Sequence, residues 1–406
     1  MTITKRRNNS CNQHISILLF YEKNCGGESI ATENIYQQLK QTKNLKVKAF
    51  KLTKLKKTNS VSFFRWHIKN ILYAAKQIYQ HRQFNFIYTT TYTAGVAASI
   101  LKSIYNKFNY KICFHYHGNR LPDKPNKNLK TLQQLTQFIK YHLSYQLHKV
   151  FLLSTDLIFV PSHFSKQHFM QHFPFIKNKR IIIVANGVDT SKFKSVSKTQ
   201  QKKLRKKYQL FKDSTKSNKK IISYVGSINP RKNLLLLIET FAKLIKNNDN
   251  YLLLIIHPKV ESAEEIAYLK KIKQQVAQLK INHQVKWFIS PHKIEHFYQI
   301  SDLVILLSHL EHMALVVLEA LACKTLLMSS TSGFSKKILL AIDSKLVINS
   351  QKPISIANQI EQICNQSFQD LKLVKNKSRQ ITAKYSWGKT AKLIAKELSN
   401  QQVQNQ

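Results

Sequence analysis

The chain has 406 residues, enough for two domains of about 150–200 residues that each bury a core. Its 65 Lys and Arg against 20 Asp and Glu give a net charge of +45, which predicts attraction to nucleic acid, anionic lipid or phosphorylated substrates. The same composition, rich in Lys, Asn and Gln with only 8 glycines, is also what an A+T-rich genome produces. No apolar run reaches the roughly 20 residues of a membrane span, no secretory signal is visible, and the five cysteines show neither zinc nor disulfide spacing, which indicates a cytoplasmic protein.

The first half of the sequence alternates short apolar runs with amphipathic stretches. The runs of strand length are His14–Phe20, Leu45–Leu52, Phe86–Thr90, Lys111–His115, Leu157–Val160 and Arg180–Val184. Between them lie helical patterns such as Ile30–Lys40 and Phe64–Tyr79, the second with a continuous apolar face. Such alternation predicts parallel strands joined by helical crossovers.

The same alternation resumes after a lysine-rich segment at 195–220, which we expect to be a linker. The later strands are expected at Ile221–Val225, Tyr251–Ile256, Val285–Phe288, Leu303–Leu307 and Thr325–Met328, and the chain closes on a helical stretch, Ile381–Leu398. We therefore predict an α/β protein with two doubly wound, Rossmann-like domains at 14–194 and 221–375, a basic tail at 1–13, and a C-terminal helical part at 376–406 that packs back toward the first domain. Ligands would bind in the cleft between the domains, at the carboxyl ends of the strands.

The most informative segment is 301–328, where a buried strand runs into a loop with Glu311, and Glu319 follows within a helix after seven residues. This segment resembles glycosyltransferase family 4, whose fold is called GT-B and whose members carry two such glutamates at the donor site. The resemblance implies that Glu319 binds the ribose hydroxyls and that Glu311 lies near the donor sugar. It also implies that Leu315, between them in sequence, belongs to the donor-binding residues. Without that context, two glutamates at this spacing would be only a solvated pair on a helix.

A second match is the segment 224–237, in which a strand leads to Gly226 and then to Arg231 and Lys232 before a helix. In the family a lysine in this position contacts the donor phosphates, so the resemblance implies a phosphate site. Ser227 stands where many members have arginine, and Arg231 is our candidate substitute. The segments Val160–His163 and Val184–Asp189 also match the family; for the Asn186–Gly187 turn we expect a structural role in the interdomain loop.

Two matches in the first half point to the acceptor side. Gly26 and Gly27 follow the first strand, as the glycine loop of the family does, and would let backbone amides approach phosphate or sugar; a plain turn explains them equally well. His117 follows another strand end, where a family histidine lies beside the reacting sugar.

The sequence departs from the family at several glycine positions. Many members have Gly-Phe-Gly where this chain has His312, Met313 and Ala314, and Gly-Thr-Pro where it has Lys324, Thr325 and Leu326. Larger residues there narrow the space for a diphosphate. Activity therefore follows less directly from the sequence than the fold does.

The resemblance implies transfer of a sugar with retention from a UDP- or GDP-linked donor, bound by the second domain, to a cell-envelope glycan or glycolipid, such as a lipopolysaccharide, bound by the first. It implies no metal and no cofactor, and no Asp-x-Asp pair is present. His117 and Glu311 are the predicted catalytic residues.

Other interpretations stay open. A silent GT-B partner of another transferase fits the lost glycines, a nucleotide-sugar epimerase of the same fold lacks support at the donor site, and a nucleic-acid-binding protein would explain the charge but has no recognition motif. Basic, aromatic helices such as Ser62–Tyr79 and Phe138–Phe151 leave peripheral attachment to the inner face of an anionic membrane as a hypothesis; their apolar faces would equally cover the sheet.

Overall fold

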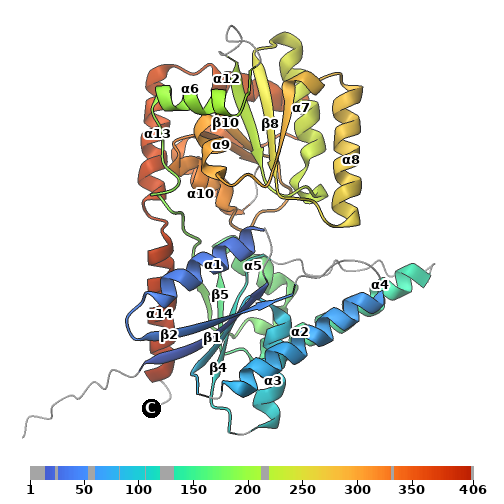
Figure 1. The fold of residues 1–406 in the computed structure, drawn as a ribbon, viewed down its shortest axis with the longest axis vertical. Coiled ribbons are helices and arrows are strands. Elements are labelled where there is room, and N and C mark those ends of the chain that lie inside the picture. The colour runs from blue at the N-terminus through green and yellow to red at the C-terminus, as the bar shows by residue number, and fades with distance from the viewer. Residues whose placement is uncertain are drawn as a thin grey trace, which may run out of the picture.

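A computed structural model describes residues 14–22, 26–53, 60–81, 83–105, 107–118, 132–211, 219–330 and 333–403. These residues form two lobes, each with a six-stranded sheet whose neighbouring strands are parallel (Figure 1). The predicted α/β architecture with two doubly wound halves is confirmed. The basic tail predicted at 1–13 lies outside the described residues, as do Asn24 and Cys25 next to the predicted glycine loop.

The first lobe contains the sheet β2-β1-β3-β4-β5-β6. Its strands are β1 (Ile15–Glu22), β2 (Leu45–Leu52), β3 (Phe86–Thr89), β4 (Lys111–His115), β5 (Leu157–Val160) and β6 (Ile181–Ile183). Its helices are α1 (Gly27–Lys40), α2 (Ser60–Gln80), α3 (Tyr92–Ile104), α4 (Leu132–Ser154) and α5 (His163–His172). One apolar cluster joins the sheet to α2, α3, α4 and α5, and another joins it to α1 and the C-terminal helix.

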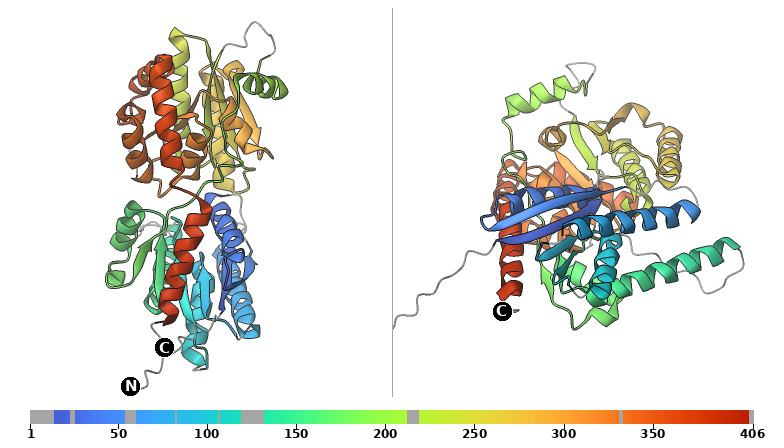
Figure 2. Two further views of the ribbon diagram at one scale, coloured as in Figure 1. Left: turned by 90° about the vertical axis from the view of Figure 1, so that its left-hand side faces the viewer. Right: turned by 60° about the horizontal axis from the view of Figure 1, so that its bottom comes forward.

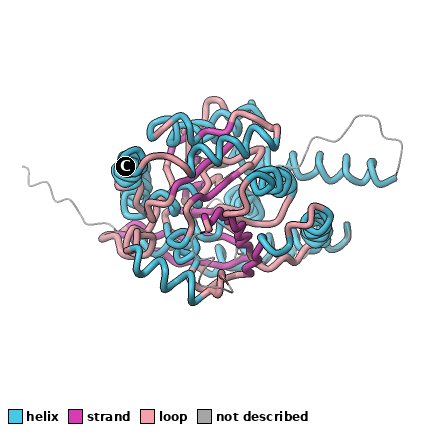
Figure 3. Tube along the Cα trace, turned by 90° about the horizontal axis from the view of Figure 1, so that it is seen from above, coloured by secondary structure: helices cyan, strands magenta, loops and turns pink. Residues whose placement is uncertain are grey.

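The second lobe contains the sheet β12-β11-β10-β7-β8-β9. Its strands are β7 (Lys220–Val225), β8 (Tyr251–His257), β9 (Val285–Ile289), β10 (Leu303–Leu306), β11 (Leu326–Ser330) and β12 (Val347–Ile348). Its helices are α7 (Leu234–Asn247), α8 (Ala263–Gln278), α9 (Ile294–Ile300), α10 (Leu315–Ala322), α11 (Gly333–Ile342), α12 (Pro353–Cys364) and α13 (Phe368–Thr382). Figure 3 shows the strands of the molecule enclosed by helices, and a single large apolar cluster fills this lobe.

The segment assigned as a linker from the sequence contains a helix, α6 (Lys198–Lys207). Leu204 belongs to the apolar cluster of the second lobe, and Arg205 donates to the Ile300 carbonyl oxygen and to Asp302 at 2.8 and 2.9 Å. Residues up to 211 therefore pack as part of the second lobe, while residues 212–218 lie outside the described residues.

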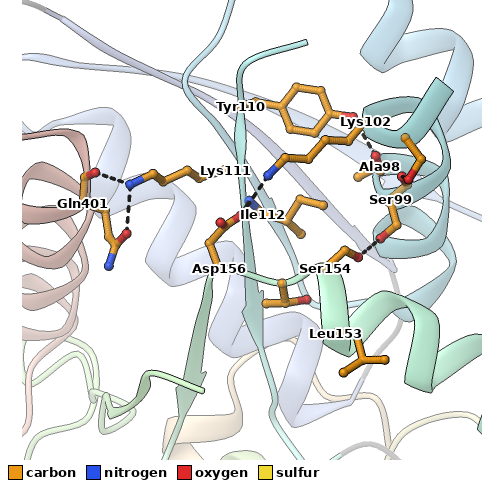
Figure 4. A network of polar contacts seen from close by, with 12 residues as sticks. Ala98, Ser99, Lys102, Tyr110, Lys111, Ile112, Leu153, Ser154, Asp156 and Gln401 are labelled. Atoms are coloured by element: carbon orange, nitrogen blue, oxygen red, sulfur yellow. Dashed lines mark hydrogen bonds and ion pairs between the residues drawn. The ribbon is translucent and has the colours of Figure 1, made fainter. Parts of the chain in front are cut away.

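The C-terminal helix α14 (Trp387–Val403) returns to the first lobe and packs against α1 (Figure 2). Its buried residues Ile394 and Leu398 join the apolar cluster beneath that helix. At its end, Gln401 accepts from the Lys111 ammonium of β4, with the Oε1 atom 3.0 Å away (Figure 4). The predicted single helical stretch Ile381–Leu398 is thus two helices, because the chain breaks between α13 and α14.

Each sheet reverses its strand order once, between β1 and β3 in the first lobe and between β7 and β10 in the second. Such reversals leave a crevice at the carboxyl ends of the strands, where ligands bind in open α/β sheets. The predicted site residues follow β1, β4, β7 and β10, and so lie at these two crevices. None of the helices in the described ranges is both long and apolar enough to cross a membrane.

Candidate active site

The loop after β10 connects the second lobe to the first. The Asn186 backbone N–H donates to Met313 Sδ at 3.2 Å, and its side-chain amide donates to the Met313 carbonyl oxygen at 3.3 Å. Leu315, at the start of α10, is 8% exposed and belongs to an apolar cluster of the first lobe. A Cβ atom built on Gly27 would lie 3.9 Å from the Leu315 Cδ1 atom, so the predicted glycine loop and the predicted donor helix face each other.

His312 inserts its ring into the first lobe. The ring contacts Tyr116, Phe164 and His168, with centroids 5.4, 5.9 and 5.1 Å apart. The backbone carbonyl oxygen of His312 accepts from Ser162 Oγ at 2.9 Å. Burial lowers the pKa of His312 to about 4, so the ring is neutral at pH 7 and suits this aromatic pocket.

Gly118 is required for that insertion. Its φ of +89° lies in a region that side chains rarely adopt, and a Cβ atom would come within 2.1 Å of His312 Cδ2. The residue that replaces a family glycine in the second lobe is therefore accommodated by a glycine of the first.

Lys232 and Glu311 form a buried ion pair at the carboxyl ends of β7 and β10. A short 3-10 turn, Pro230–Lys232, presents the lysine, and Asn233 with φ +54° turns the chain into α7. The side chains are 14% and 8% exposed. Burial alone would raise the pKa of Glu311, but the Lys232 ammonium and then the Arg231 guanidinium hold it below its usual value. The carboxylate is thus ionised, and the loop keeps a net positive charge.

Arg231 completes this cationic loop. One of its terminal nitrogens approaches the Leu310 carbonyl oxygen at 3.4 Å, while its buried Nε has no acceptor among the described residues. Gly226, at the end of β7, lies in the same crevice, and its backbone N–H donates to the Ile256 carbonyl oxygen at 3.0 Å. A Cβ atom there would meet the Tyr224 hydroxyl at 2.7 Å.

Glu319 lies on α10, apart from the Lys232–Glu311 pair, and accepts a hydrogen bond from the Tyr298 hydroxyl at 2.5 Å. Tyr298 is completely buried, and Phe193 packs against its ring with centroids 5.8 Å apart. Burial raises the pKa of Glu319 to about 6, opposed by the hydrogen bond from Tyr298. One carboxylate oxygen is therefore positioned by Tyr298. The first turn of α10 has no side-chain cap, so backbone N–H groups point out of it.

His117 lies in the first lobe, where it stacks on His115 with ring centroids 4.0 Å apart. Its Nε2 atom is 3.5 Å from Thr32 Oγ1, and its buried Nδ1 has no partner within the described residues. Burial lowers the pKa of His117 to about 3, so its ring is neutral at pH 7. A neutral imidazole both donates and accepts hydrogen bonds, as contact with a sugar hydroxyl requires.

The structure brings Gly226, Arg231, Lys232 and Glu311 into one crevice and sets Leu315 opposite Gly27, while Gly26 precedes α1 as its N-terminal cap residue. Sequence reasoning missed Tyr298 as the partner of Glu319, and it missed Gly118. A glycine directly after a strand-end histidine was the available signal for Gly118. Within the described ranges, no group of three or more His, Cys, Asp or Glu side chains is arranged to hold a metal ion.

Two family models match the chain in succession. Residues 44–192 match the model described as Glycosyltransferase Family 4, and residues 206–386 match the one described as Glycosyl transferases group 1. The two matched regions fall on the first and the second lobe.

Curated relatives include a lipopolysaccharide 1,2-N-acetylglucosaminetransferase of Salmonella typhimurium, 28% identical over 60% of this chain and 62% of that protein. A probable sucrose-phosphate synthase of Thermosipho melanesiensis is 23% identical over 84% of this chain and 77% of that protein. The match to the Salmonella protein thus spans less than two thirds of its length.

Solved structures share the fold along almost the whole chain. Anabaena HepE in complex with UDP and glucose covers 95% of this chain and all of that one at 18% identity, with a TM-score of 0.69. Sucrose-phosphate synthase from Thermosynechococcus elongatus covers 97% of this chain and all of that one at 18% identity, with a TM-score of 0.73. The predicted GT-B fold is confirmed by these similarities.

Proposed function

Because its two lobes match these two models, the chain belongs to the group 1 and family 4 glycosyltransferases, and we propose that it transfers a sugar from a nucleotide-sugar donor to a hydroxyl of a cell-envelope glycan or glycolipid. The observation that carries the proposal is the buried Lys232–Glu311 pair beside Arg231 at the carboxyl ends of β7 and β10. Two cations against one carboxylate leave this crevice positive, which suits a nucleoside diphosphate.

The donor would lie between this cationic loop and α10. Its diphosphate would meet Lys232, Arg231 and the uncapped N–H groups of α10, and its ribose would donate to Glu319. When the bond between C1 of the sugar and the diphosphate breaks, negative charge develops on the leaving oxygen, and these cations stabilise it. UDP and GDP are the two nucleotides we propose.

On the acceptor side, neutral His117 would hydrogen-bond a hydroxyl of the sugar. The acceptor oxygen forms its bond to C1 on the face that the diphosphate leaves, so the configuration is retained, and the hydroxyl proton departs with the diphosphate. Glu311 would lie near the donor sugar and keep Lys232 in position. The reaction would need no metal or cofactor, and full activity in EDTA tests that point.

The nature of the acceptor follows the similarity to the Salmonella enzyme, whose name includes lipopolysaccharide. Such acceptors are anchored in lipid. We therefore propose that the protein works on the cytoplasmic side of the cell membrane and attaches to it peripherally.

A second candidate, a silent partner of another transferase, is favoured by one observation. His312 stands where many family members have glycine, and its ring packs against Tyr116 and Gly118 of the first lobe. If the lobes cannot separate, a donor cannot enter.

Nucleotide release decides between the two candidates. The protein is incubated with UDP- and GDP-sugars and with a lipid extract that contains the acceptor, and the released UDP or GDP is measured. The wild type is compared with Glu319→Ala and Lys271→Ala. Lys271 is exposed on α8, a helix at the outer edge of the second lobe in Figure 1, and is the matched control. Release by the wild type and the control, lost in Glu319→Ala, supports transfer; no release with any donor supports the silent partner.

A further inference from the structure

Three neighbouring helices of the first lobe, α2, α3 and α4, expose aliphatic side chains, while α2 and α4 bury polar ones. Helix α3 contacts both α2 and α4, and the N-terminal halves of α2 and α4 extend together away from the lobe in Figures 1 and 2. Three polar residues of α2 and α4 are buried: Asn70, Ser144 and His148 are 1, 6 and 8% exposed. Ile68 and Leu72, two residues before and after Asn70, are 57 and 64% exposed. Large aliphatic side chains normally show the opposite preference.

Asn70 and His148 make hydrogen bonds within the protein. Asn70 Oδ1 accepts from the Thr53 backbone N–H and hydroxyl at 3.2 and 2.9 Å. His148 Nδ1–H donates to the Ser144 carbonyl oxygen at 2.7 Å, and the ring packs on Tyr92 with centroids 4.3 Å apart. The Tyr92 contact joins α4 to α3, and the Thr53 contacts join α2 to the residue after β2. The aliphatic side chains Ile68 and Leu72 face outward.

The outward aliphatic residues form stripes along the helices. On α4 they recur at a spacing of four residues and continue near its end. More than half of the exposed large hydrophobic residues in the described part of the chain lie on these three helices: Ile68, Leu72, Tyr73, Tyr79, Ile100, Ile104, Leu135, Ile139, Leu143, Val150 and Leu153. Tyr79 of α2 contacts Tyr105, just after α3, with ring centroids 5.9 Å apart, which makes the surface continuous between those two helices.

The charges on the same helices have one sign. Their Lys and Arg residues are Arg65, Lys69, Lys76, Lys102, Lys140 and Lys149, and none of the three helices contains an aspartate or a glutamate. Aliphatic stripes flanked by cations match the interface of an anionic bilayer, where the apolar side chains enter the acyl boundary and the cations meet the headgroups. A second copy of the same face is disfavoured, because two such faces would repel each other.

We propose that the exposed face of α2, α3 and α4 is a membrane-docking face that seats on the headgroups of an anionic lipid bilayer. The face belongs to the lobe that would bind the acceptor, so docking would bring a lipid-anchored acceptor to the crevice; this purpose rests on the proposed function. Lipid binding itself needs no catalysis and is measured without it.

The test is flotation of the full chain with vesicles. One vesicle contains phosphatidylglycerol and phosphatidylethanolamine, and the other only phosphatidylcholine, each at low and at high salt. The docking variant is Leu72→Glu with Ile139→Glu. The matched control is Ile266→Glu with Leu373→Glu, whose aliphatic side chains are 53 and 57% exposed on α8 and α13 of the second lobe.

We expect the wild type and the control to float with the anionic vesicles at low salt, and the docking variant to lose at least tenfold in the bound fraction. High salt should weaken binding, because the surface potential of the vesicles is screened. A second variant, Lys69→Gln with Lys76→Gln, removes only exposed charges and replaces the glutamate variant if that one misfolds. Its fraction bound to anionic vesicles should also fall about tenfold.

Three results would overturn the proposal: a wild type that does not float, equal losses in the control, or a dimer that only the docking variant dissociates. Thermal stabilisation by nucleotide, measured on the same variants, reports the donor site separately. If the docking variant no longer floats but is still stabilised by nucleotide, the result supports the docking face and says nothing against the donor site. If the wild type floats but no nucleotide stabilises it, the result counts against the donor site and leaves the docking face standing.

Discussion

The two lobes share a sheet topology, but the ends of their strands carry different chemistry. In the second lobe, charged residues meet in the crevice and Lys232 pairs with Glu311. In the first lobe, His117 and the ring of His312, which enters from the second lobe, are both held uncharged by burial. This difference supports the proposal that the second lobe holds a charged diphosphate and that the first lobe surrounds a neutral sugar. Substitutions in the crevices and between the lobes test that division, and an exposed ion pair of the first lobe gives a reference of small effect.

The largest effect is expected at the ion pair. Lys232→Met leaves Glu311 buried without its main partner, which costs about 3–5 kcal/mol of unfolding free energy. The double variant with Glu311→Gln removes the uncompensated charge and should recover most of that loss. Urea unfolding of the two variants and the wild type measures it. A loss below about 1 kcal/mol in the single variant would show that the pair is solvated and the crevice open.

The contact between the lobes gives the next effect. Gly118→Ala places a side chain at φ +89° and against His312, which we expect to cost about 1–3 kcal/mol. In the background of His312→Ala the steric part disappears, so the double variant should be more stable than the sum of the two single effects predicts. Thermal unfolding of all four proteins tests this. Strict additivity would mean that His312 does not occupy the pocket next to Gly118.

A pH profile tests how Tyr298 positions Glu319. The pKa of Glu319 is raised to about 6, so nucleotide affinity should rise as pH increases through 6, because ribose hydroxyls donate best to the ionised carboxylate. Tyr298→Phe removes a hydrogen bond that lowers this pKa and should move the midpoint upward by roughly one pH unit.

Calorimetric titration of nucleotide between pH 5 and 8 measures both midpoints. The raised pKa of Glu319 also affects the unfolding free energy of the protein without nucleotide. A carboxyl group whose pKa is raised on folding stabilises the protein at low pH, and that contribution is lost as pH rises through 6. An unchanged midpoint in Tyr298→Phe would show that Tyr298 only packs.

The smallest effect is expected at an exposed ion pair of the first lobe. Lys102 lies 3.4 Å from Asp156, with about a third of each side chain exposed (Figure 4). Lys102→Ala should change the unfolding free energy by less than about 1 kcal/mol. Asp156→Ala should cost more, because Asp156 also accepts from the Ile112 backbone N–H at 2.8 Å. Urea unfolding compares the two, and equal losses would contradict this assignment.

The fold could be predicted from the sequence because buried parallel strands are apolar on both faces and amphipathic helices separate them. Among the elements that the sequence analysis did not indicate, two were hard to predict for clear physical reasons. Strand β12 has only two residues, and α6 buries only Leu204 among lysines, so neither shows an apolar period. The break between α13 and α14 was also missed, because both helices continue the same amphipathic pattern.

The candidate site was predictable where charge and spacing combine. Lys232 and Glu311 lie 79 residues apart in sequence and form an ion pair in the structure. The alternation of strands and helices predicts only that both residues follow strands of the same domain, not that they contact each other. Tyr298 gave no signal, since a tyrosine near a strand is most often core. The place of His312 depends on Gly118 of the other lobe, and no local pattern reports such a contact.

The most direct test of the account is calorimetric titration of UDP, GDP and their sugar conjugates into the wild type, Glu319→Ala and Lys271→Ala. We predict that one nucleotide binds the wild type and Lys271→Ala with the same affinity and that Glu319→Ala loses at least tenfold. Absence of binding to every nucleotide, or equal binding by Glu319→Ala, would contradict a donor site in the second lobe.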